Sequence, residues 1–394
     1  MSVPANFPIL AQICAPMGKN HYNQYRMSHK KTGFIPFSQD SGRVIANLED
    51  AYEQWLDARQ QLIRMPVSMY WKAIGGVEYL GVKLNSNSAG TTGGARTPET
   101  EAEYDQFHSE KDALKQRVAK ADELIGERSG QYRALRLPIL ADRQGELLRA
   151  LDIEGLLRND LLVVGTNAFC AYELLCGVKF PTGNEETEDF DLAWCRGTKV
   201  SLAPSSTGAK AERKSLLSVL QGVDSTYKVN PRKRYQAINA DGYEIELLAA
   251  PSLAPLPKSE AFEPMFSLIE QEWLLKGRPV SFVVATVRRR ACPVYVPDPR
   301  WMALHKLWLS NKPERRESKK PKDRRQGEVL LDACRYFLHD NYPMDIDFVL
   351  DLPLELRDPF NEWATSNGYD PMNPDAGDAE LPEPQGKLSR RFRR

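Results

Sequence analysis

The amino-acid sequence predicts an α+β fold in which a small mixed sheet is packed with helices. Three observations support this class: helical periodicity early in the chain, a strand–helix–strand pattern that begins at Leu161, and two patterns in which β-prone runs flank glycine-containing turns. The 394 residues are 42% hydrophobic and 27% charged, with a formal net charge of zero. This composition fits roughly two or three domains with a substantial core, and the balanced charge indicates no class of partner.

Cysteine and histidine spacing argues against a zinc protein. The six cysteines include no C-x-x-C pair, and the five histidines form no H-x-x-x-H pattern. No run approaches the roughly eighteen apolar residues of a membrane span, and the N-terminus has no basic region followed by an apolar one. We therefore expect a cytoplasmic protein with reduced cysteines and no membrane contact.

Residues 1–150 are predicted to form a helical extension that carries a β-hairpin. Apolar residues recur at helical spacing over residues 44–65, which predicts the first helix. Two β-prone runs separated by Gly75 and Gly76 then predict a hairpin near residues 68–84. The Gly-, Ser- and Thr-rich stretch 85–96 is expected to be a loop.

A long charged helix is predicted to follow that loop. Thr97 offers an N-cap, Pro98 occupies the first helical position, and acidic residues fill the first turn. The helix is expected to end at about Arg133. Its charged residues outnumber its apolar ones, which is typical of a solvated spacer or of one arm of a helical hairpin.

A strand, a small-residue turn and a helix come next, at the start of a predicted core over residues 151–290. The run LLVVG predicts a buried strand that ends at Gly165, and Thr166 and Asn167 connect it to a helix that Gly177 closes. Free backbone N–H groups and a positive dipole end make such a turn suitable for a phosphate. A glycine at a strand-to-helix turn is more often only a tight connection.

Acidic residues alternate with apolar ones in two later strands. Asp189 and Asp191 share one face of a predicted strand, with Phe190 and Leu192 on the other face. After a helix-like stretch at residues 212–222, a hairpin with the turn Asp241-Gly242 is predicted, and its second strand carries Glu244 and Glu246. An acid pair on a single strand usually marks a solvated face. Acid pairs on successive strands after a Gly-Thr turn instead indicate a shared site.

A divalent cation is the expected partner of these acids. Carboxylates that share a small space repel one another, and Mg²⁺ binds one or two carboxylates together with water and substrate phosphates. Two Mg²⁺ ions, with Mn²⁺ as an alternative, would activate an attacking oxygen and stabilise a leaving pyrophosphate.

These residues resemble the nucleotidyltransferase motif of the DNA polymerase beta superfamily, in which a Gly-Gly or Gly-Ser turn precedes an acid-x-acid strand and a later strand carries a third acid. The matching segments are Gly165-Thr166, TEDFDL from Thr187, and IEL at residues 245–247. The sequence is also similar to a bacterial branch of this fold with a helical N-terminal extension. That similarity spans roughly residues 65–340 and rests on Trp71-Lys72, Tyr79-Leu80, Pro98-Glu99-Thr100-Glu101, His305-Lys306 and Lys322-Asp323 through Gln326.

The sequence departs from the superfamily pattern at two places. Thr166 stands where Gly or Ser is preferred, and the segment VKFPTGNEETE lengthens the interval between Gly165 and Asp189. A similar insertion and a T-x-D-x-D motif occur in toxin-like abortive-infection nucleotidyltransferases. The third acid is Glu244 or Glu246. We favour Glu246, because its apolar neighbours repeat those of Asp191 and because the motif places its acid there.

The resemblance implies a role for each residue. Asp189, Asp191 and Glu246 are expected to bind the metal ions, with Glu246 orienting or deprotonating the acceptor hydroxyl. Nucleotide binding is expected of Gly165, Thr166, Asn167, Thr187 and Lys306. On the predicted helix 301–309, Lys306 is equally compatible with a surface lysine, and His305 with a packed histidine. Lys322 and Asp323 are expected either to pair with each other or to support the site.

The C-terminal part is predicted to be a helical region over residues 291–370, followed by a disordered tail, 371–394, with a basic end. Within it, residues 311–326 contain far more Lys and Arg than Asp and Glu, although the chain as a whole is neutral. Such a basic strip is expected where RNA phosphates bind, and a solvated loop between helices is the alternative.

Three classes of function remain open from sequence. The favoured one is a Mg²⁺-dependent nucleotidyltransferase that moves a nucleoside monophosphate from an NTP to tRNA or another RNA, in the role of a toxin or phage-defence effector with a protein partner or antitoxin. The second is the same chemistry on a protein hydroxyl (AMPylation) or on a small molecule. The third is an inactive nucleotide-binding module, against which the presence of all three acids argues.

Overall fold

The computed structural model describes residues 33–85, 89–159, 161–181, 189–194, 215–250 and 269–374. The chain divides into two compact units, Met1–Asp298 and Pro299–Arg394. No helix in the described part of the chain is long and apolar enough to cross a membrane. The predicted tail falls mostly outside the described residues, which end at residue 374.

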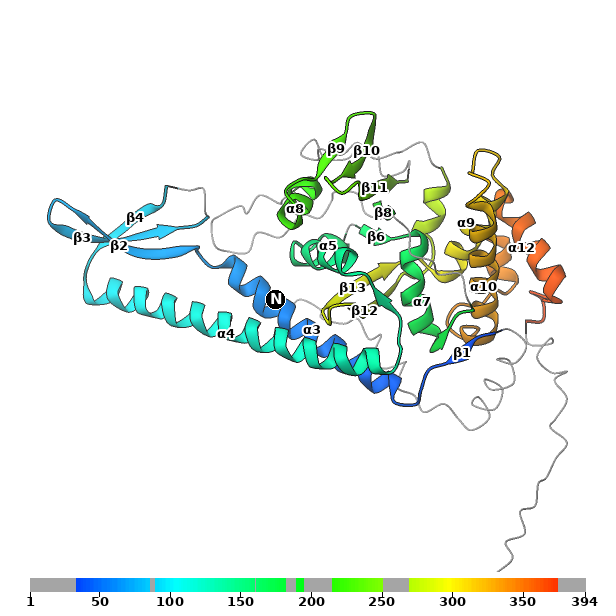
Figure 1. Ribbon diagram of the computed structural model, residues 1–394, viewed down its shortest axis with the longest axis horizontal. Coiled ribbons are helices and arrows are strands. Elements are labelled where there is room, and N and C mark those ends of the chain that lie inside the picture. The colour runs from blue at the N-terminus through cyan, green and yellow to red at the C-terminus, as the bar shows by residue number, and fades with distance from the viewer. Residues whose placement is uncertain are drawn as a thin grey trace, which may run out of the picture. The chain divides into compact units, whose positions relative to one another are not determined.

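Two long helices form the extension of the first unit (Figure 1). Helices α3 (Ser41–Arg64) and α4 (Pro98–Ala134) pack along each other. Tyr52 of α3 and Ile125 of α4 are buried within the unit. Thr97 caps α4, because its Oγ1 accepts a hydrogen bond from the Thr100 backbone N–H. In return, Thr100 Oγ1 accepts a hydrogen bond from the Thr97 backbone N–H. The predicted N-cap is confirmed, and the helix ends one residue beyond the expected Arg133.

A three-stranded antiparallel sheet joins the two long helices. Strands β2 (Ser68–Ile74) and β3 (Val77–Lys83) form the predicted hairpin, and Gly75 and Gly76 both have positive φ in its turn. The expectation of a loop over residues 85–96 was wrong for β4 (Thr91–Ala95), which pairs with β3. The segment TTGGA has no apolar alternation, so only pairing with the free edge of β3 makes it a strand.

The central sheet of the first unit is mixed and five-stranded, in the order β6–β8–β11–β10–β9. Its strands are Leu161–Val163, Asp189–Trp194, Glu244–Ala249, Lys233–Ile238 and Lys228–Asn230, respectively. Strands β8 and β11 run parallel, and every other pair in this sheet is antiparallel. The small mixed sheet of the sequence prediction is therefore confirmed.

The turn between β10 and β11 is longer than predicted. The last paired residues are Ile238 and Glu244, so five residues connect the strands instead of Asp241 and Gly242 alone. Asn239 closes this turn, because its backbone N–H bonds to the Tyr243 carbonyl and its side chain accepts from the Tyr243 N–H. An Asn side chain that bonds the backbone in this way stabilises a turn that spacing alone does not reveal.

A second sheet and several helices complete the first unit. Strands β12 (Val280–Thr286) and β13 (Ala291–Val296) are antiparallel, and β5 (Ile139–Leu140) runs parallel to β12. A two-stranded pair is formed by β1 (Ile35–Pro36) and β7 (Val178–Lys179). The remaining elements are α5 (Asp142–Ile153), α6 (Leu156–Asn159), η1 (Gly165–Ala168), α7 (Phe169–Cys176), α8 (Leu216–Val223) and η3 (Ile269–Leu275).

Helix α5 packs closely on β13 and α8. Gly145 also lets α5 approach the end of β12, because a Cβ at this position would clash with Thr286 Cγ2. Helix α7 packs on β12 and β13, and Gly177 ends it with a φ of +66° as predicted. Helices α5 and α7 thus pack on the β12–β13 sheet, which contacts the central sheet at β6.

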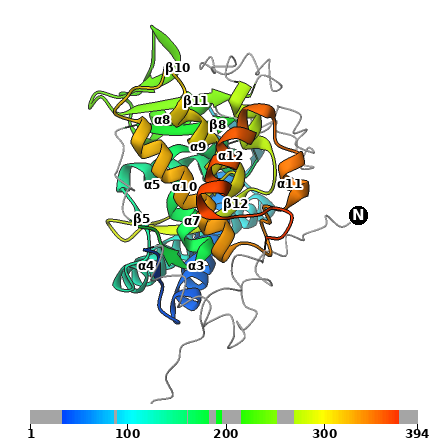
Figure 2. The same cartoon turned by 90° about the vertical axis from the view of Figure 1, so that its right-hand side faces the viewer.

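The second unit is helical (Figures 1 and 2), whereas residues 291–296 of the region predicted to be helical form strand β13 of the first unit. It contains α9 (Pro299–Asn311), α10 (Lys320–Phe337), α11 (Ile346–Leu350) and α12 (Leu354–Asn367). Helices α9 and α10 pack closely at Gly327, where a Cβ would lie 2.6 Å from Leu307 Cγ. Phe348 of α11, Phe360 and Trp363 of α12, and Tyr369 form an aromatic cluster in the core of this unit.

Candidate active site

Parallel pairing of β8 with β11 brings the predicted acidic positions together. Asp189 pairs in register with Glu244, and Asp191 pairs with Glu246. Register-paired residues of parallel strands lie on the same face of a sheet, and alternate residues of one strand share that face. The four acidic positions therefore lie on one face of two neighbouring strands. Asp189 and Asp191 are placed here by their backbones alone.

Gln236 connects the two glutamates. It lies on β10 opposite Glu246, is fully buried, and donates from Nε2 to Glu244 Oε2 at 2.9 Å and to Glu246 Oε1 at 2.6 Å. Its Oε1 accepts from Asn230 Nδ2 at 3.0 Å, and Asn230 Oδ1 accepts from the Arg232 N–H at 3.0 Å. Each bond fixes the orientation of the next amide, so both N–H groups of Gln236 are directed at carboxylates.

Sequence reasoning missed Gln236. The predicted two-residue turn would have paired Ala237 with Glu246, whereas the longer turn pairs Gln236 with it. A shift of one residue exchanges the two faces of a strand, so Gln236 was expected on the opposite face. The available signal was Asn239, a residue type that closes turns, three positions after Gln236 on the preceding strand.

The turn after β6 lies at Gly165 as predicted, but β6 itself ends at Val163, two residues earlier than expected. Gly165 has a φ of +72°, a conformation that favours glycine, and the chain continues through the short 3₁₀ helix η1 into α7. The predicted α-helical start at Ala168 lies one residue later, at Phe169. Residues of η1 contact β8, so this turn lies beside the strand of Asp189 and Asp191. Thr187, the other predicted nucleotide contact of this region, falls outside the described residues.

Lys306 lies inside the second unit. It is 5% exposed, and its Nζ donates to Asp323 Oδ1 at 2.8 Å. Arg315 binds the other oxygen of Asp323, with Nε at 2.7 Å. Asp323 therefore pairs with these two cations, which fasten α9 to α10 and to the segment between them. Two cations around one buried carboxylate leave this cluster with a net positive charge.

His305 is a packed histidine, one of the two readings that the sequence left open. It is buried beside Trp308, at a ring-centroid distance of 6.4 Å. Burial, together with the nearby Lys306 charge, lowers the pKa of His305 to about 3. The imidazole is therefore neutral near pH 7.

The basic strip 311–326 is partly helical and partly neutralised. Helix α10 begins at Lys320, so the second half of the strip is not a loop. Lys320 pairs with Glu317, and Arg324 pairs with both Glu328 and Glu362. Arg316 and Arg325 are exposed. The strip thus offers fewer cations to a ligand than its composition suggests.

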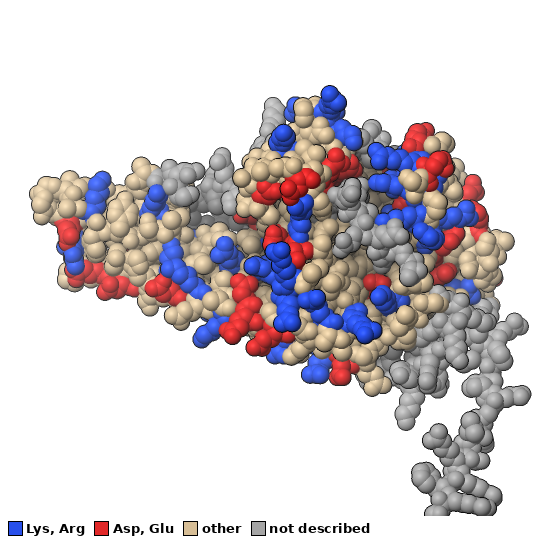
Figure 3. Space-filling model, in the orientation of Figure 1, with Lys and Arg blue, Asp and Glu red and all other residues tan. Residues whose placement is uncertain are grey.

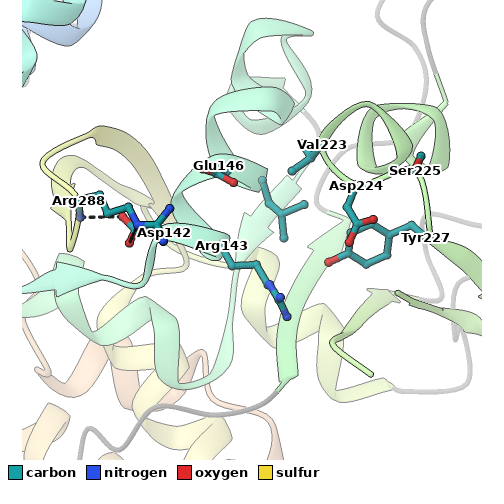
Figure 4. Close-up of a pocket in the computed structure, with 9 residues that line it drawn as sticks. Asp142, Arg143, Glu146, Val223, Asp224, Ser225, Tyr227 and Arg288 are labelled. Carbon is teal, nitrogen blue, oxygen red and sulfur yellow. Dashed lines mark hydrogen bonds and ion pairs between the residues drawn. The ribbon is translucent and has the colours of Figure 1, made fainter. Parts of the chain in front are cut away.

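A cavity of about 550 Å³ opens on the first unit between α5 and α8. Figure 4 shows Arg143 between the Asp142–Arg288 pair on one side and Asp224 and Tyr227 on the other. Two residues of the cavity wall bond to the β10–β11 turn: Arg143 pairs with Asp241, and Asp224 accepts a hydrogen bond from Asn239. Its walls are formed by Asp142, Arg143, Glu146, Leu147, Val223, Asp224, Ser225, Tyr227 and Arg288.

Two titratable groups of this cavity have shifted pKa values. Hydrogen bonds from the Thr226 hydroxyl and amide, and from Asn239, lower the pKa of Asp224. Burial raises the pKa of Tyr227 to about 12. The Tyr227 hydroxyl is buried and has no hydrogen-bond partner among the described residues. Asp224 is thus held as an anion in the cavity wall, and Tyr227 as a neutral phenol.

Among the side chains that the structure describes, no group of three or more His, Cys, Asp or Glu residues is placed to hold a metal ion. Glu244 and Glu246 are half-buried carboxylates of β11, and the backbone register adds the positions of Asp189 and Asp191 beside them. Carboxylate oxygens are the ligands that Mg²⁺ prefers, so the residues at these four positions fit a magnesium site in type and in register.

Comparison with known proteins identifies the family of the chain. A family model described as nucleotidyltransferase matches residues 142–347, which is more than half of the chain and includes both acidic strands and the Gly165 turn. The fold and the matched range define the protein as a transferase. The chain belongs to this nucleotidyltransferase family, which transfers a nucleoside monophosphate from an NTP, and the predicted enzyme class is confirmed. Neither the curated proteins nor the solved structures contain a significant match.

Proposed function

We propose that Asp189, Asp191 and Glu246 bind two Mg²⁺ ions and that this site catalyses the nucleotidyl transfer. The observation that carries the proposal is the parallel register of β8 and β11, which pairs Asp191 with Glu246 on one face of the sheet. In this arrangement the site is that of a polymerase-beta-like enzyme. Mn²⁺ is an alternative ion, since it prefers the same oxygen ligands.

Gln236 supports the fit of a cation. Its two N–H groups take one oxygen of each glutamate, Glu244 Oε2 and Glu246 Oε1, and leave the second oxygen of each for another partner. When bound, Mg²⁺ would neutralise developing charge on the phosphates and lower the pKa of the acceptor hydroxyl. Glu246 would orient that hydroxyl or accept its proton.

The remaining predicted contacts belong to the triphosphate. Gly165, Thr166 and Asn167 would bind phosphate through the backbone N–H groups of the turn, and Thr187 would add a hydroxyl. We keep Lys306 in this proposal as the sequence suggested it, and only a rearrangement of its buried pair with Asp323 would free its ammonium for a phosphate. We retain the division into an extension (1–150), a core (151–290) and a C-terminal region (291–370), which is helical from Pro299 onward, as part of this proposal.

RNA is the acceptor that we favour, with the basic strip 311–326 as a phosphate contact. The similarity to toxin-like nucleotidyltransferases extends this proposal to a toxin or phage-defence effector in the cytoplasm, controlled by a protein partner or antitoxin. A protein hydroxyl or a small molecule is the alternative acceptor. An inactive nucleotide-binding module is the third alternative.

The test is a labelling experiment. The protein is incubated with each labelled NTP, Mg²⁺ and either total RNA or lysate, and the labelled macromolecule is identified. We expect labelled RNA, and we expect Asp189→Asn and Asp191→Asn to abolish labelling while the protein stays folded, because each change is nearly isosteric. Retained labelling by both variants would contradict the metal assignment, and labelled protein would shift the acceptor to AMPylation.

Glu246→Gln and Glu244→Gln form a matched pair for the third acid. Both side chains accept from the same Gln236 amide, so the two substitutions perturb the local hydrogen bonds similarly. We expect Glu246→Gln to be far more damaging to transfer than Glu244→Gln. Equal effects would mean that the third ligand is not Glu246 alone.

A further inference from the structure

The two faces of the β2–β4 sheet differ in chemistry. Register pairing places Tyr70 opposite Gly81, Lys72 opposite Tyr79, and Ile74 opposite Val77. Opposite residues of antiparallel strands lie on the same face, and alternate residues along a strand share it. The outer face of β2 and β3, as we name it, thus carries Tyr70, Lys72, Ile74, Val77, Tyr79 and Lys83.

The other face is already occupied by the extension itself. Trp71 lies 5.5 Å from the ring of Tyr104 on α4, and Leu80 is 2% exposed. The carboxylate of Glu78 also belongs to this side, where it pairs with Arg96, whose guanidinium lies over Trp71. Consequently, the outer face of β2 and β3 has lysines but no acidic residue.

The Tyr70 ring lies against Gly81 and Gly90. A Cβ at Gly81 would lie 2.8 Å from the Tyr70 ring, and a Cβ at Gly90 would lie 2.9 Å from its hydroxyl. These two positions therefore have room for the ring only as glycines. Tyr70 remains 36% exposed in this position, and Ile74 and Val77 at the hairpin tip are 46% and 45% exposed. The result is an exposed aromatic surface with apolar neighbours.

Tyr79 extends this surface diagonally. It pairs with Lys72, two residues along from the Tyr70–Gly81 pair, and diagonal neighbours on one face are about 7–8 Å apart. On the same face, Lys72 lies directly opposite Tyr79, and Lys83, opposite Ser68, lies one pair beyond Tyr70. In Figure 3, acidic residues of the extension gather along its lower edge, over α4, with Lys and Arg above them on the sheet.

We propose that the outer face binds single-stranded RNA. Unpaired bases stack on aromatic side chains carried by a sheet, and sequence-tolerant strand binding combines such stacking with cations along the phosphate backbone. Tyr70 and Tyr79 supply the stacking surfaces, and Lys72 and Lys83 supply the cations. The bases of a duplex are not available for stacking, so a duplex is a poor ligand. This inference rests on the proposed RNA acceptor and gives the extension the task of holding it.

The test measures binding of a fluorescent single-stranded oligouridylate by anisotropy, without NTP or Mg²⁺. We use the Asp189→Asn protein as well as the parent, so that binding is measured independently of transfer. Tyr70→Leu and Tyr79→Leu keep an apolar side chain over the sheet but remove the ring. Loss of one stacked base corresponds to roughly 5- to 150-fold weaker binding, and Tyr70→Phe should bind like the parent.

Replacing the lysines tests the phosphate contact separately, through the salt dependence of RNA affinity, and leaves the aromatic rings in place. Lys72→Ser with Lys83→Ser should reduce the slope of log affinity against log salt by about 0.7 for each contact. Lys115→Ser with Lys120→Ser, on α4, is the matched control and removes equal charge from the same extension. Both pairs should leave the unfolding transition unchanged.

Each outcome bears on a different claim. Equal loss of binding in both lysine pairs would reduce the effect to net charge and overturn the assignment of the face. Equal affinity for single-stranded and duplex RNA would overturn the stacking. If the parent binds the strand through Tyr70 and Tyr79 but labels no RNA, the face stands and the proposed RNA acceptor fails. If RNA is labelled and the outer-face variants bind normally, the face is wrong and the proposed function stands.

Discussion

Replacing Gln236 by Met tests whether one amide holds both glutamates of the acidic strand. The substitution keeps the length of the side chain and removes its two N–H donors and its acceptor. Glu244 and Glu246 then lose their shared donor, and Asn230 Nδ2 loses its acceptor. Without this donor, the repulsion between the two carboxylates is no longer offset by a shared hydrogen-bond partner.

The magnitude follows from the hydrogen bonds. A bond to a charged group contributes about 1.5–3 kcal/mol, so two such bonds set an upper limit of about 3–6 kcal/mol. Both glutamates are only half-buried, and water replaces part of what is lost. We therefore expect Gln236→Met to lower the free energy of unfolding by about 2–3 kcal/mol, measured by urea denaturation in EDTA.

Added Mg²⁺ separates positioning from packing. If Gln236 orients metal ligands, the variant should also bind Mg²⁺ more weakly, so the metal should raise its unfolding midpoint less than it raises that of the parent. Asn230→Ala, which leaves both bonds from Gln236 to the glutamates possible, should show a smaller effect of the same kind. A loss below about 0.5 kcal/mol, or an unchanged response to Mg²⁺, would refute the reasoning.

Three further predictions concern other parts of the chain. Burial raises the pKa of Glu173 to about 7 from its ordinary 4.5, so the folded state gives up stability as pH rises from about 4.5 to 7. Glu173→Gln, which can still accept from the Phe180 N–H, should match the parent near pH 4.5 and be more stable by about 3 kcal/mol at pH 8; a constant difference in the free energy of unfolding at both pH values would contradict this. Tyr227→Phe should change the free energy of unfolding by less than about 0.5 kcal/mol, because its hydroxyl has no partner among the described residues, whereas Tyr52→Phe should cost about 2 kcal/mol through its 3.0 Å bond to buried Asp152; equal losses would show that the Tyr227 hydroxyl is bonded. Arg316→Ser with Arg325→Ser should flatten the salt dependence of RNA affinity by about 1.4 without loss of stability, while Arg315→Ser should be destabilising because Arg315 binds buried Asp323; identical salt slopes would remove the strip from the RNA contact.

Local rules determined much of this protein from sequence. Thr97 and Pro98 start α4, Gly75 and Gly76 turn the hairpin, and Gly177 ends α7, because caps and turns depend on the hydrogen bonds of a few neighbouring residues. The alternation around Asp191 and Glu246 likewise predicts which residues share a face of each strand.

Only the tertiary structure decided which residues meet. The parallel register of β8 with β11, the burial of Lys306 against Asp323, and the pairing of TTGGA with β3 join segments that are distant in sequence, and no local pattern encodes their alignment. Gln236 shows the consequence most directly. One miscounted turn length moves it to the wrong face, because the side chains of a strand alternate with a period of two, and the true register is set by how Asn239 closes the turn and how the sheet packs on its helices.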